Sequence, residues 1–159
     1  MKKFELTSET KINIFGKKLF RIKALVSFGV VKTGETGGWV EKEENVYQSG
    51  DAWVFDNAEV FDNARVFGNA EVSDNAWVSG NAEVSDNADY ATIHGFGTQF
   101  RTTTFFRCKD KQVKVSCGCF YGTIPEFCEQ VKNTRKGKIA EEYLMIADLM
   151  EKHFAEEAK

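Results

Sequence analysis

Alanine recurs at every sixth position from Ala52 to Ala88, and this regularity constrains the fold more than any other feature of the chain. The seven alanines keep this spacing without interruption. Each of the first six hexads reads alanine, a variable residue, valine, Phe or Ser, Asp or Gly, and then asparagine. A fixed short period of this kind is the sequence signature of a solenoid.

Within each hexad, the alternation of Ala, a variable residue and Val is typical of a short strand whose Ala and Val side chains share one face. The following Asp-Asn or Gly-Asn pair indicates a tight corner, because Asn and Gly accept a positive φ. Three hexads make a coil of eighteen residues, so we expect Ala52 to stack on Ala70 and Asn57 on Asn75. The sequence therefore predicts a mainly β fold, a parallel β-helix with Ala and Val inside and hydrogen-bonded Asn ladders at the corners.

The segments on either side of the repeat have different patterns, which divide the chain into three predicted parts. Residues 1–38 alternate apolar and polar side chains around a Gly16-Lys17 turn, and we predict an N-terminal β-hairpin that caps the first coil. Residues 39–95 form the predicted hexapeptide-repeat β-helix, and residues 96–159 form a C-terminal αβ module. A cap is expected because an open β-helix end exposes unpaired backbone groups.

The C-terminal module has clear local signals. The stretch Arg101–Phe120 predicts a second hairpin that turns at Lys109-Asp110-Lys111. Thr123-Ile124-Pro125-Glu126 has the pattern of a capping box with proline in the first turn, so a helix is expected to begin there. A final helix is expected from about Lys138, after Gly137.

The repeat Val-[Phe/Ser]-[Asp/Gly]-Asn-Ala-x resembles the hexapeptide repeat of left-handed β-helix proteins. Two flanking stretches, Gly37-Gly38-Trp39-Val40-Glu41 and Cys117–Phe127, make the chain similar to uncharacterised phage and prophage proteins that join such a repeat to a small C-terminal αβ module. The resemblance implies a left-handed coil and a homo-oligomer, with a trimer favoured. It implies no settled activity.

The charge distribution limits the partners that we expect. The formal net charge is −3, but residues 50–91 contain nine acids and a single base, Arg65. We expect Arg65 to lie one coil below Glu83 as an exposed pair, and we expect the acidic surface to repel long nucleic acids. No apolar stretch approaches the roughly 20 residues of a membrane span, and Met1-Lys2-Lys3 lacks the apolar run of a signal peptide, so a cytoplasmic location is predicted, in the host if the gene is viral.

Histidine is the residue that connects the repeat to known chemistry. Hexapeptide β-helix proteins are best known as trimeric acyltransferases, in which an imidazole acts as general base. The chain has two histidines, His94 just after the repeat and His153 near the C-terminus. His94 is therefore the alternative catalytic residue, but a polar loop residue is the simpler interpretation. Our preferred interpretation assigns neither a catalytic residue nor a cofactor.

Four cysteines lie in the C-terminal module, at Cys108, Cys117, Cys119 and Cys128. A four-thiolate zinc site is one alternative, but the spacing lacks the paired Cys-x-x-Cys knuckles of common zinc folds. Disulfides are a weaker alternative in a cytoplasm. Because Cys117 and Cys119 continue an apolar strand face, we interpret these cysteines as packing residues and predict no metal.

Five aromatic residues occupy outward positions of the hexads and form the predicted interface: Trp53, Phe55, Phe61, Phe67 and Trp77. Exposed aromatics clustered this densely indicate a cover. The sequence leaves two alternatives for what covers these aromatic residues. One is the N-terminal hairpin, and the other is a second subunit or a host protein.

Basic residues of the C-terminal module are the candidate phosphate contacts: Arg101, Arg107, Lys109, Arg135 and Lys136. A solvated surface is the alternative interpretation. The preferred function is a non-enzymatic, phage-type oligomeric binding protein directed at the host, a counter-defence inhibitor that binds a host protein or sequesters a small nucleotide signal. An acyltransferase that uses His94 and a structural accessory protein are the alternatives.

Overall fold

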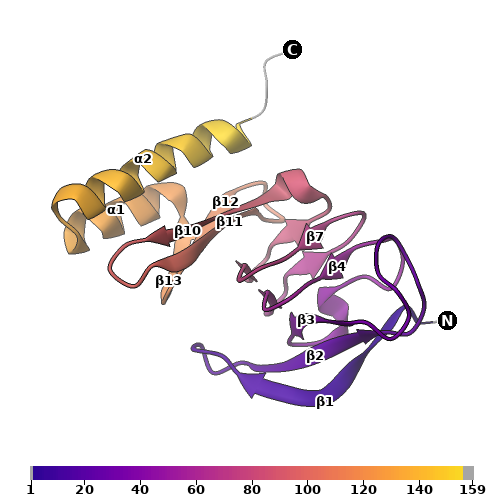
Figure 1. Ribbon diagram of the computed structural model, residues 1–159. Helices are drawn as coiled ribbons and strands as arrows, with labels where there is room; N and C mark the ends of the chain where they lie inside the picture. Colours follow the sequence, from indigo (N-terminus) through magenta and orange to yellow (C-terminus); the bar gives the residue numbers. More distant parts are fainter. Residues whose placement is uncertain (1, 156–159) are drawn as a thin grey trace.

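A computed structural model describes residues 2–155 of the chain (Figure 1). The N-terminal part contains three strands and a short 3-10 helix: β1 (Phe4–Ile12), β2 (Lys18–Ala24), β3 (Thr36–Val40) and η1 (Glu43–Asn45). The hexads contain two-residue strands: β4 (Trp53–Val54), β5 (Glu59–Val60), β6 (Arg65–Val66), β7 (Glu71–Val72), β8 (Trp77–Val78) and β9 (Glu83–Val84). The C-terminal part contains η2 (Asn87–Asp89), β10 (Tyr90–Phe96), β11 (Arg101–Arg107), β12 (Val113–Cys117), β13 (Phe120–Thr123), α1 (Ile124–Thr134) and α2 (Gly137–Phe154).

The short hexad strands pair in parallel at an offset of eighteen residues, as the period predicts. Trp53 is the register partner of Glu71, and the other two strand pairs repeat this offset. The hexad alanines from Ala52 to Ala82 and all six hexad valines are at most 1% exposed. The predicted inward faces are therefore confirmed at the level of individual strands.

The predicted fold class, a parallel β-helix of either hand, is nevertheless wrong. The sheets are a five-stranded mixed sheet (β1-β2-β3-β5-β8), a four-stranded antiparallel sheet (β10-β11-β12-β13) and two isolated pairs, β4-β7 and β6-β9. Residues 2–155 form no closed solenoid. The reason is that six hexads supply only two strands of two residues at each of three positions, so most of the sheet area comes from antiparallel segments outside the repeat.

The corners between hexads meet the expectation only in part, because Gly68 and Gly80 have the expected positive φ and no hexad asparagine does. The positive φ falls on the residue before asparagine, and these residues are Asp56, Asp62, Gly68, Asp74 and Gly80. Three of the asparagines instead use their backbone: the N–H of Asn57 donates to the carbonyl of Asp74 at 3.1 Å, that of Asn63 to Gly80 at 3.0 Å and that of Asn69 to Ser85 at 3.2 Å. No hydrogen bond joins stacked asparagine side chains in the described part of the chain, so the predicted Asn ladder is wrong.

The N-terminal segment forms the predicted β-hairpin. Strands β1 and β2 pair in antiparallel fashion, and β3 joins this hairpin to the hexads by pairing in parallel with β5. Lys3 lies just before β1, and its ammonium donates to the carbonyl oxygens of Gly50 and Ala52 at 3.2 and 2.8 Å. Lys3 thus supplies hydrogen bonds to two carbonyls at the start of the first hexad strand.

The C-terminal module has the predicted hairpin and both predicted helices. The capping box is confirmed, because the N–H of Glu126 donates to the Thr123 hydroxyl and the Glu126 carboxylate accepts from the N–H of Thr123. Strand β10 is an addition, since Tyr90–Phe96 pairs with β11 and extends the sheet beyond the hairpin. Figure 1 shows α1 and α2 packed on this sheet, at the end of the molecule away from the N-terminal hairpin. No described helix is long and apolar enough to cross a membrane.

The thin interior makes the alanine positions sensitive to size. Ala70→Phe should lower the free energy of unfolding by at least about 1–3 kcal/mol, because Ala70 is fully buried and its neighbours leave no space. Glu71→Ala, on the exposed side of the same strand, is the control and should change it by less than about 0.5 kcal/mol. Urea denaturation of the two variants measures both. An unchanged Ala70→Phe midpoint would contradict the described interior.

Lys3 gives the fold a measurable pH dependence. Burial lowers the pKa of Lys3 from its ordinary value of 10.5 to about 8, against the opposing charge of Asp51. Between these values the unfolded chain binds the proton and the folded chain does not, so Lys3 makes the free energy of unfolding rise with pH. The difference in unfolding free energy between wild type and Lys3→Met should therefore increase from about pH 8 to about pH 10.5. A difference that stays flat or falls would show that Lys3 is not buried.

Candidate functional site

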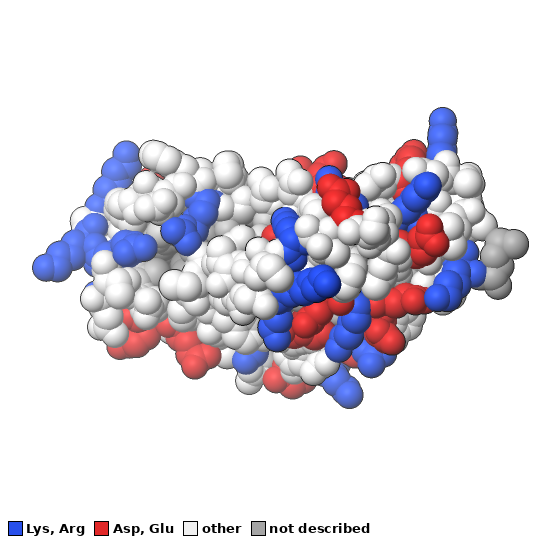
Figure 2. All heavy atoms as spheres, turned by 90° about the horizontal axis from the view of Figure 1, so that it is seen from below, with Lys and Arg blue, Asp and Glu red and all other residues white. Residues whose placement is uncertain are grey.

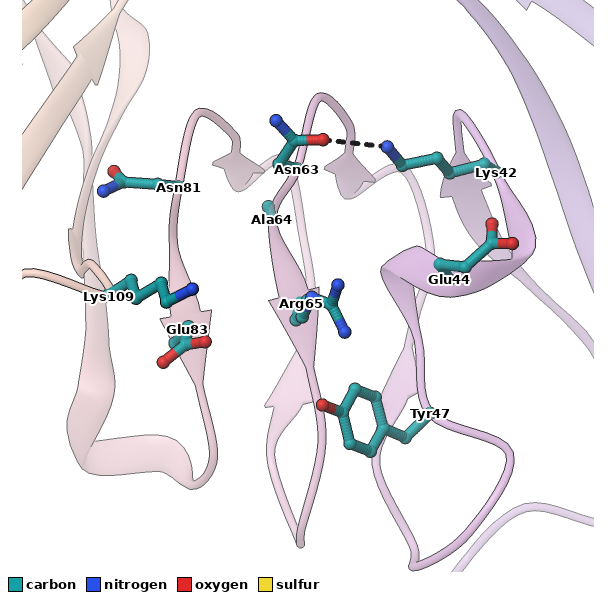
Figure 3. Close-up of a pocket in the computed structure, with 9 residues that line it drawn as sticks. All are labelled: Lys42, Glu44, Tyr47, Asn63, Ala64, Arg65, Asn81, Glu83 and Lys109. Atoms are coloured by element: carbon teal, nitrogen blue, oxygen red, sulfur yellow. Dashed lines mark hydrogen bonds between the residues drawn. The ribbon is translucent and has the colours of Figure 1, made fainter.

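A polar groove of about 730 Å³ lies beside the paired strands β6 and β9 (Figure 3). One wall is the segment from Lys42 to Tyr47, which includes η1. The opposite wall is the turn between β11 and β12, which carries Lys109. Arg65 and Glu83 stand between the walls.

The hexad pattern places Arg65 and Glu83 in this groove. Both occupy the variable position of their hexad, and they are register partners in the β6–β9 pair. Ala and Val of these strands face the interior, so the variable side chains point outward. The groove is open because the N-terminal hairpin joins the sheet that contains β5 and β8, and not the β6–β9 pair.

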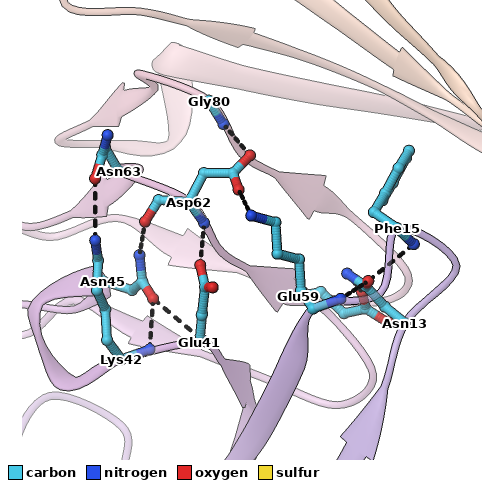
Figure 4. A network of polar contacts seen from close by, with 10 residues as sticks. Asn13, Phe15, Glu41, Lys42, Asn45, Glu59, Asp62, Asn63 and Gly80 are labelled. Carbon is cyan, nitrogen blue, oxygen red and sulfur yellow. Dashed lines mark hydrogen bonds and ion pairs between the residues drawn. The ribbon is translucent and has the colours of Figure 1, made fainter.

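The first wall is held by the buried side chain of Asn45. Its amide oxygen accepts from the backbone N–H groups of Glu41 and Lys42 at 3.1 and 2.9 Å. Its amide nitrogen donates to the carbonyl oxygens of Asp62 and Ala64 at 3.3 and 2.8 Å. Figure 4 shows how these bonds tie η1 to the corner that precedes β6. Every hydrogen-bonding position of the amide is used, which fixes the wall.

The corner residue Asp62 connects this wall to the hairpin. Its carboxylate pairs with Lys17 at 3.0 Å and accepts from the N–H of Gly80 at 3.2 Å, while its own N–H donates to Glu41 at 2.7 Å (Figure 4). The hydrogen bond and charge of Asp62 raise the pKa of Lys17. The floor of the groove is therefore tied to three segments that are distant in sequence.

Tyr47 supplies the aromatic edge of the groove. Its ring stacks on Phe67, with centroids 5.0 Å apart and an interplanar angle of 29°. The Tyr47 side chain lines the groove, and Figure 3 shows Tyr47 and Arg65 directed toward one another. Stacking on Phe67 holds the ring in place without a ligand.

The charges of the groove are unbalanced in favour of cations. Its lining contains Lys42, Arg65 and Lys109 against Glu44 and Glu83. Lys42 donates to the Asn63 side chain at 3.0 Å. Within residues 2–155, Arg65 and Lys109 form no ion pair, and the predicted Arg65–Glu83 pair is not made. Two cations are thus left to receive an anion.

The second wall is fixed through its backbone. The N–H of Lys109 donates to the carbonyl of Asn81 at 2.9 Å, and Cys108 forms an isolated antiparallel bridge with Ala82. These contacts dock the β11–β12 turn on β9. The side chain of Lys109 is consequently held at the groove although it is distant from Arg65 in sequence.

Two of the predicted interface aromatics are buried inside the chain. Trp53 is 1% exposed and packs edge-on against Phe4 and Phe28 of the N-terminal segment. Phe61 is 2% exposed and packs with Leu19 of β2. The N-terminal segment is therefore the cover for both, and the alternative of a second subunit does not apply to them.

The other three aromatics are half-buried by neighbours in the same chain. Phe55 packs against the hexad core, Phe67 stacks on Tyr47, and Trp77 lies against Phe15 of the hairpin turn at 5.9 Å between centroids. The excess of aromatics along the hexads is thus explained by packing within the chain.

His94 lies on β10 in a second hollow of about 330 Å³, together with Trp77 and Arg101. Its Nδ1 is hydrogen-bonded to the Thr102 hydroxyl at 2.8 Å. Glu59 also lines this hollow, but its carboxylate pairs with Lys11 at 2.9 Å. In the described structure no carboxylate orients the imidazole, as a general base usually requires.

The predicted phosphate contacts do not converge. Arg107 is engaged in contacts within the fold: its guanidinium pairs with Asp89 at 3.2 Å and donates to the carbonyl of Phe154 at 3.1 Å. Lys136 is exposed at the beginning of α2. Lys109 belongs to the groove, away from both.

Arg101 and Arg135 do come together, in a third hollow of about 140 Å³ that Tyr143 also lines. Burial, with the nearby Cys117 thiol, raises the pKa of Tyr143 to about 12. Figure 2 shows basic groups gathered at the end of the molecule where α1 and α2 meet, and mixed charges over the hairpin and hexads. This hollow is smaller than the roughly 300–1,000 Å³ of common small-molecule sites.

The four cysteines are free and do not form one site. Cys108 belongs to the hexad core, and burial raises the pKa of its thiol to about 12. Cys117 and Cys128 pack in the helix-covered core, and Cys119 is exposed. No three potential ligands among His, Cys, Asp and Glu gather as a metal site in residues 2–155. The four-thiolate alternative is therefore not formed there.

Sequence reasoning identified part of the groove. Arg65 stood out as the single base of the hexads, and Lys109 was a candidate phosphate contact. Lys42 and Tyr47 gave no signal, because they follow the last long N-terminal strand outside any periodic pattern. No protein-family model matches the chain, and no curated protein matches it either. The resemblance to phage hexapeptide proteins stays a prediction from motifs.

The amide of Asn45 allows a test of how the groove wall is held. Asn45→Ala should lower the free energy of unfolding by about 1–3 kcal/mol, because it removes a buried amide that hydrogen-bonds four backbone groups at buried or part-buried positions. Asn63→Ala removes an exposed amide of the same groove and should cost less than about 0.5 kcal/mol. Thermal unfolding measures both. Equal effects of the two substitutions would contradict the role assigned to Asn45.

Proposed function

We propose that this protein is a non-enzymatic binding protein that holds a small phosphate-bearing ligand, a nucleotide, in the groove of Lys42, Tyr47, Arg65 and Lys109. The observation that supports this proposal is the presence of two cations in one concave surface, Arg65 on its floor and Lys109 on one wall, without ion-pair partners in the described structure. Exposed cations that converge on a groove bind anions more strongly than the same charges on a convex surface.

The groove has the size and side chains for such a ligand. Small-molecule sites commonly occupy about 300–1,000 Å³, and the groove lies within that range. The planar guanidinium of Arg65 can bind two phosphate oxygens at once, and Lys109 can add a point charge from the neighbouring wall. Tyr47 offers aromatic surface for a base, an interaction worth about 1–3 kcal/mol per base in single-strand binding proteins.

The acids of the groove narrow the ligand class. Glu44 and Glu83 accept hydrogen bonds but repel additional negative charge, so a long polyanion is disfavoured. A nucleotide carries phosphates for the cations together with sugar hydroxyls and base N–H groups for the carboxylates. It therefore matches the groove better than inorganic phosphate or a nucleic acid does.

The proposed biological role is sequestration of a nucleotide signal, as a host-directed counter-defence protein. This part of the proposal rests on the motif resemblance of the hexads and their flanks. The acyltransferase alternative would use His94, which lies in a different hollow from Arg65 and Lys109. A structural accessory protein would need no ligand at all.

Calorimetric titration with linear and cyclic mono- and dinucleotides tests the proposal. Arg65→Ala and Lys109→Ala should each weaken binding of a nucleotide at least about tenfold, in line with loss of one charge-assisted contact. Lys23→Ala is the control, because it removes one exposed positive charge from β2, outside the groove. Its affinity should equal that of wild type.

Three outcomes would overturn the proposal in different ways. Loss of binding in Arg101→Ala or Arg135→Ala, with Arg65→Ala unaffected, would move the ligand to the small hollow by Tyr143. If no nucleotide binds, the nucleotide proposal is wrong and the structural accessory role is favoured. If the protein turns over an acyl-coenzyme A and His94→Ala abolishes this activity, the acyltransferase alternative would be established.

A further inference from the structure

The outer face of α2 carries large apolar side chains that no residue of the described segment 2–155 covers. Met145 is 70% exposed and Leu149 is 56% exposed. The opposite face of the helix is buried against α1 and the four-stranded sheet, through residues such as Tyr143 and Met150. Figure 1 shows α2 as the outermost element at this end of the molecule.

The uncovered face has the spacing of a coiled-coil seam. Its residues are separated alternately by four and three positions: Lys138, Glu142, Met145, Leu149 and Lys152. Alternation of this kind keeps side chains along one stripe that faces a partner helix. A solvated helix face has no reason to place its two exposed apolar residues at the centre of such a stripe.

The charges of the stripe are arranged symmetrically about Ala147. Met145 and Leu149 lie two residues before and after it, and Glu142 and Lys152 lie five residues before and after it. Neither Glu142 nor Lys152 forms an ion pair in the described part of the chain. The stripe is therefore complementary to an antiparallel copy of itself.

We propose that two copies of this chain associate through the exposed stripe of α2, packed antiparallel about a two-fold axis that crosses the stripe between Met145 and Leu149. Met145 of each copy then packs on Leu149 of the other, and Glu142 of each copy faces Lys152 of the other. A parallel arrangement would instead place Glu142 against Glu142 and Lys152 against Lys152, which is unfavourable. Isologous contacts of this kind are the commonest way in which soluble chains form dimers.

One residue limits the strength of the contact. Asp148 is exposed beside the centre of the stripe, so the two copies of Asp148 approach each other near the axis. Their repulsion opposes association, and two helices of this length bury less than a standard interface of about 1,600 Å². The dimer is consequently a weak one, which dissociates on dilution. It differs from the trimer that the motif resemblance implies.

Sedimentation velocity over a range of concentrations tests the pairing. Wild type should pass from 18.0 kDa to twice that mass as concentration rises. Leu149→Glu should weaken association at least about tenfold, because it places a charge in the apolar centre. Asp148→Asn should strengthen association several-fold, and Glu151→Gln, which removes one charge from outside the stripe, is its control.

Exchanging the charges of Glu142 and Lys152 distinguishes specific antiparallel pairing from nonspecific hydrophobic association. Glu142→Lys and Lys152→Glu should each weaken association, and the double variant should recover the wild-type constant, because it restores both pairs in opposite polarity. All these positions are on the outer side of α2, and unchanged melting temperatures would show that each variant is folded. A monomer at every concentration, an oligomer insensitive to these changes, or a double variant without recovery would each overturn the proposal.

Discussion

The interior of the hexad strands, built only from alanine and valine, is the constraint on which the rest of the structure depends. These side chains are fully buried, and the pairing of strands eighteen residues apart leaves no room for larger ones. All chemistry must therefore lie on the outward positions and on whatever covers them. The hairpin covers the side of β5 and β8, and the β6–β9 pair remains open as the floor of the groove.

Local features of the fold were predictable because they depend on neighbouring residues. The spacing of the hexads gave the register of the short strands, and Thr123 and Glu126 gave the beginning of α1. The fold class was not predictable in the same way. A repeat signal does not report how many strands are needed to close a solenoid, and here the antiparallel flanks contribute more sheet than the hexads do.

The candidate site was only partly predictable for a related physical reason. Arg65 was visible as a charge that breaks an acidic pattern, whereas Lys42 and Lys109 reach the groove through contacts between distant segments. The aromatics gave an ambiguous signal, because a side chain such as Trp53 is outward from its strand and still buried by the hairpin. Two exposed apolar side chains, Met145 and Leu149, lie instead on α2, where the sequence showed only an amphipathic helix.

We propose the groove beside β6 and β9 as the ligand site of this protein. A map of backbone amide chemical shifts during titration with a bound nucleotide tests it most directly, because each amide reports its own surroundings. We expect the largest changes at Tyr47, Arg65 and Lys109, with little change around His94. Changes confined to the neighbourhood of His94 and Arg101, or no changes at saturating nucleotide, would contradict it.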